Sequence, residues 1–180
     1  ATGSTPGSRT FTQTHRYLDD NPLATGSDSY TIMATVTDDD TGTGNLSTTV
    51  EVVNVAPIMA LNAVTAIVEN GVVTLTGVVT DPGTADTFTV DIDWGDGSET
   101  QTIRLDASAT GSTPGSLTFT QTHHYLDDNP SATDSDSSTI TATDTDDDTG
   151  TANLLNTLDD ANDVATIDLH PDTRITKNDA

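Results

Sequence analysis

One long stretch of this sequence occurs twice, and this repeat constrains what the chain can fold into. The residues ATGSTPGSRTFTQTHRYLDDNP, which begin at Ala1, return with two changes from Ala109. Residues 1–47 and 109–155 are identical at 38 of 47 positions, and His15 aligns with His123, so the period is 108 residues. Solenoid repeats have periods of about 20–50 residues. The longer period therefore predicts tandem copies of a whole domain.

Apolar and polar residues alternate in several segments of the chain. In the segments 87–94 and 72–80, the apolar face consists of Phe88, Val90, Ile92 and Trp94, and of Val73, Leu75, Gly77 and Val79. A period of two residues is that of a strand with one buried face. No segment has a convincing period of 3.6 residues. Short alternating segments separated by turn residues predict an all-β fold, an antiparallel β-sandwich.

The charge of the chain limits its partners. It has 29 acidic residues against five Lys and Arg, which gives a net charge of −24. Such a charge repels nucleic acid and anionic membranes, and it attracts divalent cations or basic partners. We therefore expect no nucleic-acid partner, and the absence of a long apolar run predicts no membrane insertion. The chain has no cysteine, so disulfides cannot stabilise it.

Three motifs follow one another in the second half of the chain. They are VDIDWGDGS (residues 90–98), HHY (123–125) and STITATDTDDDTG (138–150). Together they resemble the PKD-type immunoglobulin-like domain, which carries a W/I-D-x-G-D-G turn, an H-x-Y motif and a YTVTLTVTD strand. In the first copy, SYTIMATVTDDDTG (29–42) is the nearer match to that strand.

The resemblance implies an immunoglobulin-like β-sandwich of the PKD type and a division of the chain into three parts. Residues 56–158 form a complete repeat, and residues 1–55 are the C-terminal half of a truncated repeat. Residues 159–180 form an acidic tail in which VATIDL offers a replacement final strand. We expect the native strand order, in which strands from 58–105 pair with those from 117–158, because its connections cost less loop entropy. The alternative is capture of strands 72–105 by the first half.

The stretch DIDWGDGSET (91–100) has two interpretations. As a turn, Gly95 and Gly97 permit positive φ and Trp94 anchors the reversal in the core, which requires no ligand. As a calcium site, its ligands are Asp91, Asp93 and Asp96, from one strand face and the adjoining turn. It is not an EF-hand loop, because position 102 is Thr where that motif has Glu.

Further acidic clusters follow the strands. One contains Asp38 and Asp40, its copy contains Asp146 and Asp148, and the LDDNP loops add Asp19, Asp20, Asp127 and Asp128. A solvated loop is the alternative interpretation of each cluster. Taken together, the clusters predict calcium as a cofactor, bound with a Kd on the order of 10⁻⁴–10⁻³ M, which is typical of extracellular modules.

The histidines invite an enzymatic interpretation that we reject. The H-x-Y pattern occurs inside a strand in both copies, which indicates a packed His and a hydrogen-bonded Tyr. The sequence has no G-x-S-x-G, H-E-x-x-H or phosphate-binding loop and no thiol nucleophile. We therefore expect no catalytic activity.

The remaining functions are non-catalytic. The leading hypothesis is a structural or adhesive spacer module in a secreted or cell-surface protein of many repeats. Its partners are neighbouring repeats, with an extracellular protein or polysaccharide as a further partner. The alternative is an accessory domain of a secreted hydrolase that contacts a polysaccharide or protein substrate. The chain has only seven aromatic residues, four of them on expected core faces, so the platform typical of sugar binding is missing.

The two copies differ at positions that we expect to face inward. Tyr30, Val36 and Val52 in the first copy correspond to Ser138, Asp144 and Asp160 in the second. An ionised buried Asp144 without a partner costs several kcal/mol. We therefore expect the strand to fray after Ala142, or Asp144 to lie at an edge, or its pKa to be raised.

Overall fold

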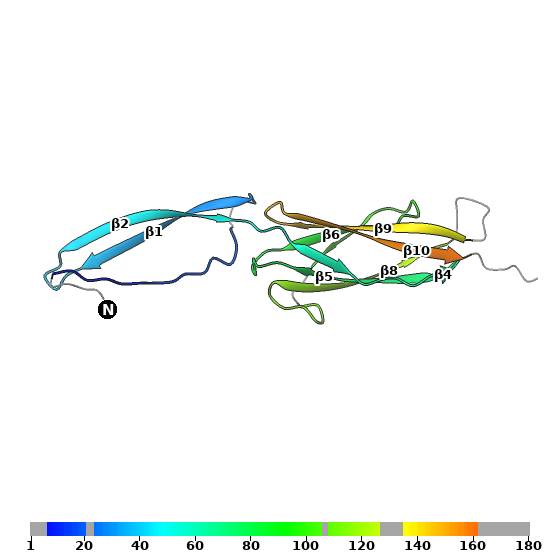
Figure 1. Cartoon of the computed structure of the whole chain (residues 1–180), viewed down its shortest axis with the longest axis horizontal. Helices are drawn as coiled ribbons and strands as arrows, with labels where there is room; N and C mark the ends of the chain where they lie inside the picture. Colours follow the sequence, from blue (N-terminus) through cyan, green and yellow to red (C-terminus); the bar gives the residue numbers. More distant parts are fainter. Residues whose placement is uncertain (1–6, 21–23, 106–107, 127–134, 162–180) are drawn as a thin grey trace, which may run out of the picture.

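A computed structural model of the chain describes residues 7–20, 24–105, 108–126 and 135–161 (Figure 1). These residues form ten strands and no helix, so none of them belongs to a helix that could cross a membrane. The strands are β1 (Ser27–Thr37), β2 (Thr43–Val53), β3 (Ile58–Leu61), β4 (Ile67–Val68), β5 (Val72–Thr80), β6 (Phe88–Asp93), β7 (Gln101–Arg104), β8 (Ser116–His124), β9 (Ser135–Asp146) and β10 (Thr151–Ala161).

The strands from β3 to β10 form a β-sandwich. One sheet has the order β4-β10-β9-β6-β7 and the other has the order β3-β5-β8. All pairs are antiparallel except β4 with β10. β6 pairs with β9, so the native strand order holds. The prediction of an all-β protein with antiparallel sheets is confirmed.

The alternation of residues in the strands accounts for the core between the two sheets. The side chains expected to face inward are buried: Val73, Leu75 and Val79 of β5, Phe88, Val90 and Ile92 of β6, and Trp94, Phe119 and Tyr125. Burial of apolar surface stabilises a fold by about 25 cal/mol per Å². Gly77 is also buried, because it lies opposite Phe119 in the register and its missing side chain makes room for that ring.

The remaining sheet is the β1–β2 hairpin, which repeats the β9–β10 hairpin residue by residue. Thr37 pairs with Thr43 and Ser27 with Val53, and the residues 108 positions later pair in the same way. The turns also agree: Gly42 N donates to Asp38 Oδ1 over 2.6 Å, and Gly150 N donates to Asp146 Oδ1 over 2.6 Å. In these two hairpins, the repeat in the sequence is therefore a repeat of structure.

The hairpin and the sandwich lie end to end along the long axis of the molecule (Figure 1), joined by residues 54–57. Within the described ranges, β1 and β2 pair only with each other. Val36 was expected to face a core, and this was wrong: it is 70% exposed, because no second sheet of the described residues covers this face of the hairpin.

Of the three outcomes expected for Asp144, which were fraying of its strand, an edge position or a raised pKa, the third occurs. β9 continues to Asp146, and Asp144 lies in the central part of the sheet between β6 and β10, fully buried. Neither of its carboxylate oxygens has a hydrogen-bond partner. Burial and the nearby carboxylate of Asp146 raise the pKa of Asp144 to about 7. The segment VATIDL, proposed as a replacement strand, lies outside the described residues.

Candidate metal centre

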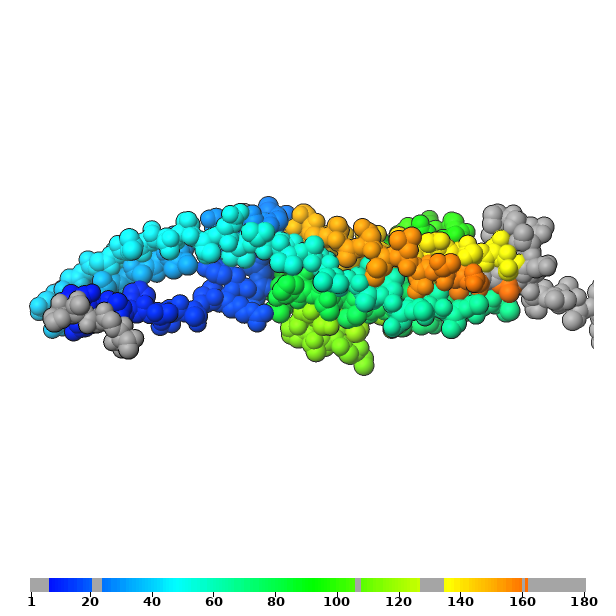
Figure 2. All heavy atoms as spheres, in the orientation of Figure 1, coloured from blue at the N-terminus to red at the C-terminus, as the bar shows by residue number. Residues whose placement is uncertain are grey.

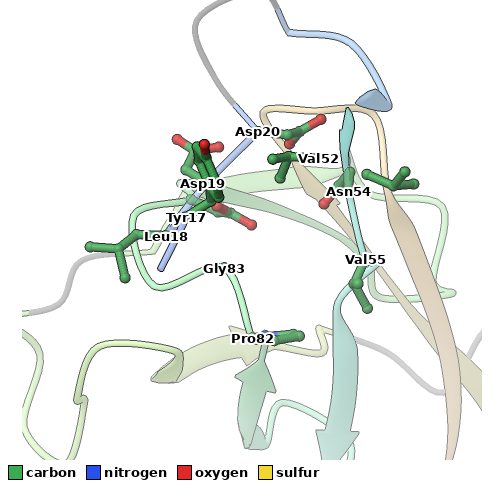
Figure 3. Close-up of a pocket in the computed structure, with 11 residues that line it drawn as sticks. Tyr17, Leu18, Asp19, Asp20, Val52, Asn54, Val55, Pro82 and Gly83 are labelled. Atoms are coloured by element: carbon green, nitrogen blue, oxygen red, sulfur yellow. The ribbon is translucent and has the colours of Figure 1, made fainter. Parts of the chain in front are cut away.

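Six carboxylates meet where the hairpin part of the chain contacts the sandwich. Asp81 follows β5, Asp86 lies in the loop before β6, and Asp146 and Asp148 lie at the end of β9 and in the turn after it. Asp19 and Asp20 belong to the segment that precedes β1 (Figure 3). We call this set the junction cluster: Asp19, Asp20, Asp81, Asp86, Asp146 and Asp148.

The oxygen atoms of the junction cluster are close enough to share a cation. Carboxylate oxygens of Asp19, Asp86 and Asp148 all lie within 4.8 Å of one another, and so do those of Asp81, Asp86 and Asp146. Calcium binds oxygen at 2.3–2.6 Å, so two of its ligand atoms lie up to about 5 Å apart. Asp86 belongs to both groups, which places it at the centre of the cluster.

Several of these carboxylates are buried without a donor to bind them. Asp148 is 1% exposed, Asp20 3% and Asp81 6%, and the Oδ2 atom of each is buried with no hydrogen-bond donor. The groups next to Asp148 are the carboxylates of Asp19 and Asp20. No Lys or Arg forms an ion pair in the described parts of the chain. A buried carboxylate is stable only when it is paired, coordinated to a metal or neutralised by a proton.

The electrostatics of the cluster follow from this burial. Burial, and after it the carboxylate of Asp81, raises the pKa of Asp86 to about 7. Burial and the carboxylates of Asp20 and Asp19 raise the pKa of Asp148 to about 7. The pKa of Asp81 is raised as well, chiefly by burial. At neutral pH the cluster therefore contains buried carboxylates that repel one another, and a bound cation would reduce this repulsion.

Other contacts hold the cluster in place. Asp146 Oδ1 accepts hydrogen bonds from the backbone N–H groups of Asp148 and Gly150, over 3.0 and 2.6 Å. Asp81 Oδ1 accepts one from Gly83 N over 2.6 Å. These bonds to nearby backbone groups orient both carboxylates. Asp81 and Asp146 are therefore candidate ligands that also stabilise the loops of the site.

Two residues of the hairpin part also bind the sandwich at this junction. Asn54 Nδ2 donates to Asp146 Oδ2 over 3.0 Å, and Ala85 N donates to Leu18 O over 3.3 Å. A hollow of about 170 Å³ lies here (Figure 3), lined by Tyr17, Leu18, Asp19, Asp20, Val52, Val53, Asn54, Val55, Pro82, Gly83 and Asp86. The site thus contains groups from both parts of the chain.

The acids of the DIDWGDGSET stretch are placed differently. Asp93 Oδ1 accepts from Gly95 N over 3.0 Å, Asp96 Oδ1 accepts from Ser98 N over 3.0 Å, and Asp91 accepts from the hydroxyl of Thr102. Gly95 has a φ of 79°, as the turn interpretation requires. The three acids lie at the opposite end of β6 from the junction cluster, and within the described ranges they belong to no group of three close carboxylates.

The H-x-Y motif packs against this same turn. The ring of His123 stacks on Trp94 with centroids 4.8 Å apart, and its Nε2 lies 2.7 Å from Asp96 Oδ2. The hydroxyl of Tyr125 donates to the carbonyl of Trp94 over 2.7 Å. These contacts give both residues a structural role at the far end of the sandwich.

The two DDD turns differ in their surroundings. Asp146 and Asp148 join the junction cluster, whereas Asp38 and Asp40 are exposed, and Asp38 accepts a hydrogen bond from Gly42 N of its own turn. Among the described residues, no segment equivalent to that of Asp81 and Asp86 lies beside the turn of the first copy, which explains the difference. Asp127 and Asp128 lie outside the described residues.

Sequence reasoning missed Asp81, Asp86 and Asn54. Their separation along the chain conceals them, because Asp81 and Asp146 are 65 positions apart and meet only through strand pairing. The pattern of strands contained a signal: β5 and β9 end at the same end of the sandwich, β9 at Asp146 and β5 one residue before Asp81.

Comparison with known proteins adds little. No protein-family model matches the sequence, and neither does any curated protein. Among solved structures, the chain is similar to the Pseudomonas fluorescens alkylpurine DNA glycosylase AlkC bound to DNA containing an abasic site analog. The match has a TM-score of 0.29 and 12% identity, and it covers 54% of this chain and 30% of that chain. This likeness is too weak to indicate a fold or a function.

Proposed function

We propose that this protein is a non-catalytic spacer module of a secreted or cell-surface protein of many repeats, and that calcium joins consecutive units at the junction cluster. The observation that carries the proposal is the origin of the carboxylates: Asp19 precedes the hairpin, whereas Asp86 and Asp148 belong to the sandwich. An ion held by all three would join the two units end to end.

The donor set favours calcium over other metals. All of the close groups are carboxylates, with no His or Cys among them, and hard oxygen ligands suit calcium and magnesium. Calcium accepts six to eight oxygens in irregular geometry, whereas magnesium requires near-octahedral geometry and retains several waters. A crowded set of six acids from separate loops fits calcium better.

The aromatic residues favour a spacer over an accessory domain of a hydrolase. Phe88, Trp94, Phe119 and Tyr125 are all buried in the sandwich. A carbohydrate-binding surface requires exposed aromatic rings on which sugars stack, and the rings of the sandwich are not available for this. We therefore propose neighbouring repeats as the main partners; an extracellular protein or polysaccharide remains the further partner of the proposal, and these buried rings give no support to the polysaccharide.

Calorimetric titration of the full chain with calcium at pH 7.5 tests the proposal. We expect binding with a Kd on the order of 10⁻⁴–10⁻³ M. The Asp86→Asn variant should lose this binding, because Asp86 belongs to both groups of close carboxylates. The matched control is Asp40→Asn, an exposed acid of the hairpin turn, which should bind as the natural chain does. Equal binding by the two variants would refute a site at the junction.

A further inference from the structure

The β1–β2 hairpin exposes an apolar face that its copy in the sandwich buries. Ile32 is 46% exposed, Val36 70% and Leu46 78%, and all three project from one face of the hairpin. Beside them, Phe11 is 79% exposed. A hollow of about 320 Å³ lies between Phe11 and the hairpin, and an opening is visible there in Figure 2.

The second copy shows what covers this face. Ile140 and Ala142, the equivalents of Ile32 and Ala34, are fully buried, and Phe119, the equivalent of Phe11, is 7% exposed. The opposite sheet, β3-β5-β8, covers this face, and two of its strands, β3 and β5, lie within residues 58–105. β6 also pairs with the edge of β9 that corresponds to the edge of β1 facing away from β2, the only strand with which β1 pairs among the described residues.

The segment before the hairpin supports the same conclusion. Residues 8–16 and 116–124 differ at only two positions, yet residues 116–124 form β8 and residues 8–16 form no strand. β8 pairs with β5 along its whole length. The two differences are Arg9, whose equivalent Leu117 is buried, and Arg16, whose equivalent is His124. A closely similar sequence thus forms a strand where it lies beside β5 and forms none in the first copy.

At one position of β1 the first copy is also the better match for such a partner. Asp144 lies opposite Val90 of β6, where both of its carboxylate oxygens are buried without a hydrogen bond. The equivalent residue in the hairpin is Val36. A segment like β6 would therefore meet an apolar side chain in the first copy, where the second copy presents a carboxylate.

We infer that the β1–β2 hairpin and residues 8–16 bind a second copy of segment 58–105, joined in tandem ahead of Ala1, and so complete another sandwich. Because the two hairpins share one register, the pairing is defined: Val90 of the added copy lies opposite Val36, and Ile92 opposite Ala34. The added Trp94 would stack on His15, whose contact with Tyr17 at 4.7 Å repeats that of His123 with Tyr125 at 4.8 Å. Tandem linkage favours this partner, since it makes the association intramolecular.

Hydrogen exchange of an extended chain tests the inference. Residues 57–108 are placed directly before Ala1 of the full chain, which restores the period of 108 residues. We expect the backbone amides of residues 33–37 to exchange at least about 100-fold more slowly than in the natural chain. The amides of residues 74–79 serve as an internal reference, because they belong to the core of the sandwich in both proteins.

A second extended chain carries Val36→Asp, which makes the hairpin resemble the second copy. In this variant, the amides of residues 33–37 should exchange at least about tenfold faster than in the first extended chain, and those of residues 74–79 should exchange at the same rate. The added segment should slow the exchange of these amides both in calcium and in chelator, so the test does not depend on the metal site. If exchange in β1 is the same with and without the added segment, while residues 74–79 stay protected, the inference is wrong.

Discussion

Val36 and Asp144 occupy the same position in the two copies, and each has the surroundings that would suit the other. Val36 is 70% exposed, whereas Asp144 is fully buried with neither carboxylate oxygen hydrogen-bonded. The first copy keeps an apolar face without a covering sheet, and the second copy places a carboxylate under one. This mismatch affects three properties: the stability of the sandwich, its response to pH and the exposure of the apolar face of the hairpin.

Replacing the buried carboxylate should stabilise the sandwich. We expect Asp144→Val to raise the free energy of unfolding by about 2 kcal/mol, because a buried polar group without a partner is removed and valine fits the same strand position. Urea denaturation of the full chain measures the change. The matched control is Val36→Asp, which should change the stability by less than about 0.5 kcal/mol, since that side chain is exposed. A destabilised Asp144→Val would show that the carboxylate has a partner in solution.

The stability of the metal-free protein should fall as pH rises between about 4 and 7. The pKa values of Asp86, Asp144 and Asp148 are about 7 in the folded protein, against about 3.9 in an unfolded chain. The folded state therefore holds more protons in this range, and raising the pH favours unfolding. The stability that these protonated acids contribute is fully present below about pH 4 and is lost by about pH 7.

Melting curves in chelator at a series of pH values measure this fall. Asp144→Val should reduce its slope, because it removes one of the titrating groups. Calcium should offset the fall at pH 7 and have little effect near pH 4.5, where protons compete for the carboxylates. A melting temperature that rises steadily from pH 4.5 to 7 in chelator would contradict the raised pKa values.

Gly77 should tolerate no side chain. A Cβ there would lie 2.5 Å from Cζ of Phe119 and 2.9 Å from Cδ2 of Leu61. We expect Gly77→Ala to destabilise the sandwich by about 1–3 kcal/mol, the usual cost of overpacking a core. Gly44→Ala is the control, since a Cβ there meets only Val36 at 3.4 Å and the second copy has Ala152 at this position. Equal stability of the two variants would mean that Phe119 moves aside at little cost.

The core of the sandwich could be predicted from the sequence, and the candidate site only in part. Alternation identified the buried faces of β5 and β6, and the glycines of WGDG indicated a turn. Such features depend on neighbouring residues in the chain. Asp146 and Asp148 were recognised as candidate ligands, but their partners Asp81 and Asp86 were not, because only strand pairing brings these four together.

The exposure of the hairpin face could not be predicted from its own residues. Val36 lies in a strand whose pattern is that of a buried face, and the same pattern in β9 is buried. The difference arises from the sheet that packs against one hairpin and not the other. In the same way, residues 8–16 closely match the sequence of β8 but form no strand.

A distance measurement across the junction tests most directly whether calcium joins the two units. The chain has no cysteine, so Thr49→Cys on β2 and Glu99→Cys beyond β6 give two unique sites for spin labels, both exposed. With calcium at about 10 mM, well above the expected Kd, we expect a single narrow distance distribution, which broadens in chelator and in the Asp86→Asn variant. Distributions of equal width with calcium, with chelator and in the variant would show that calcium does not hold the junction.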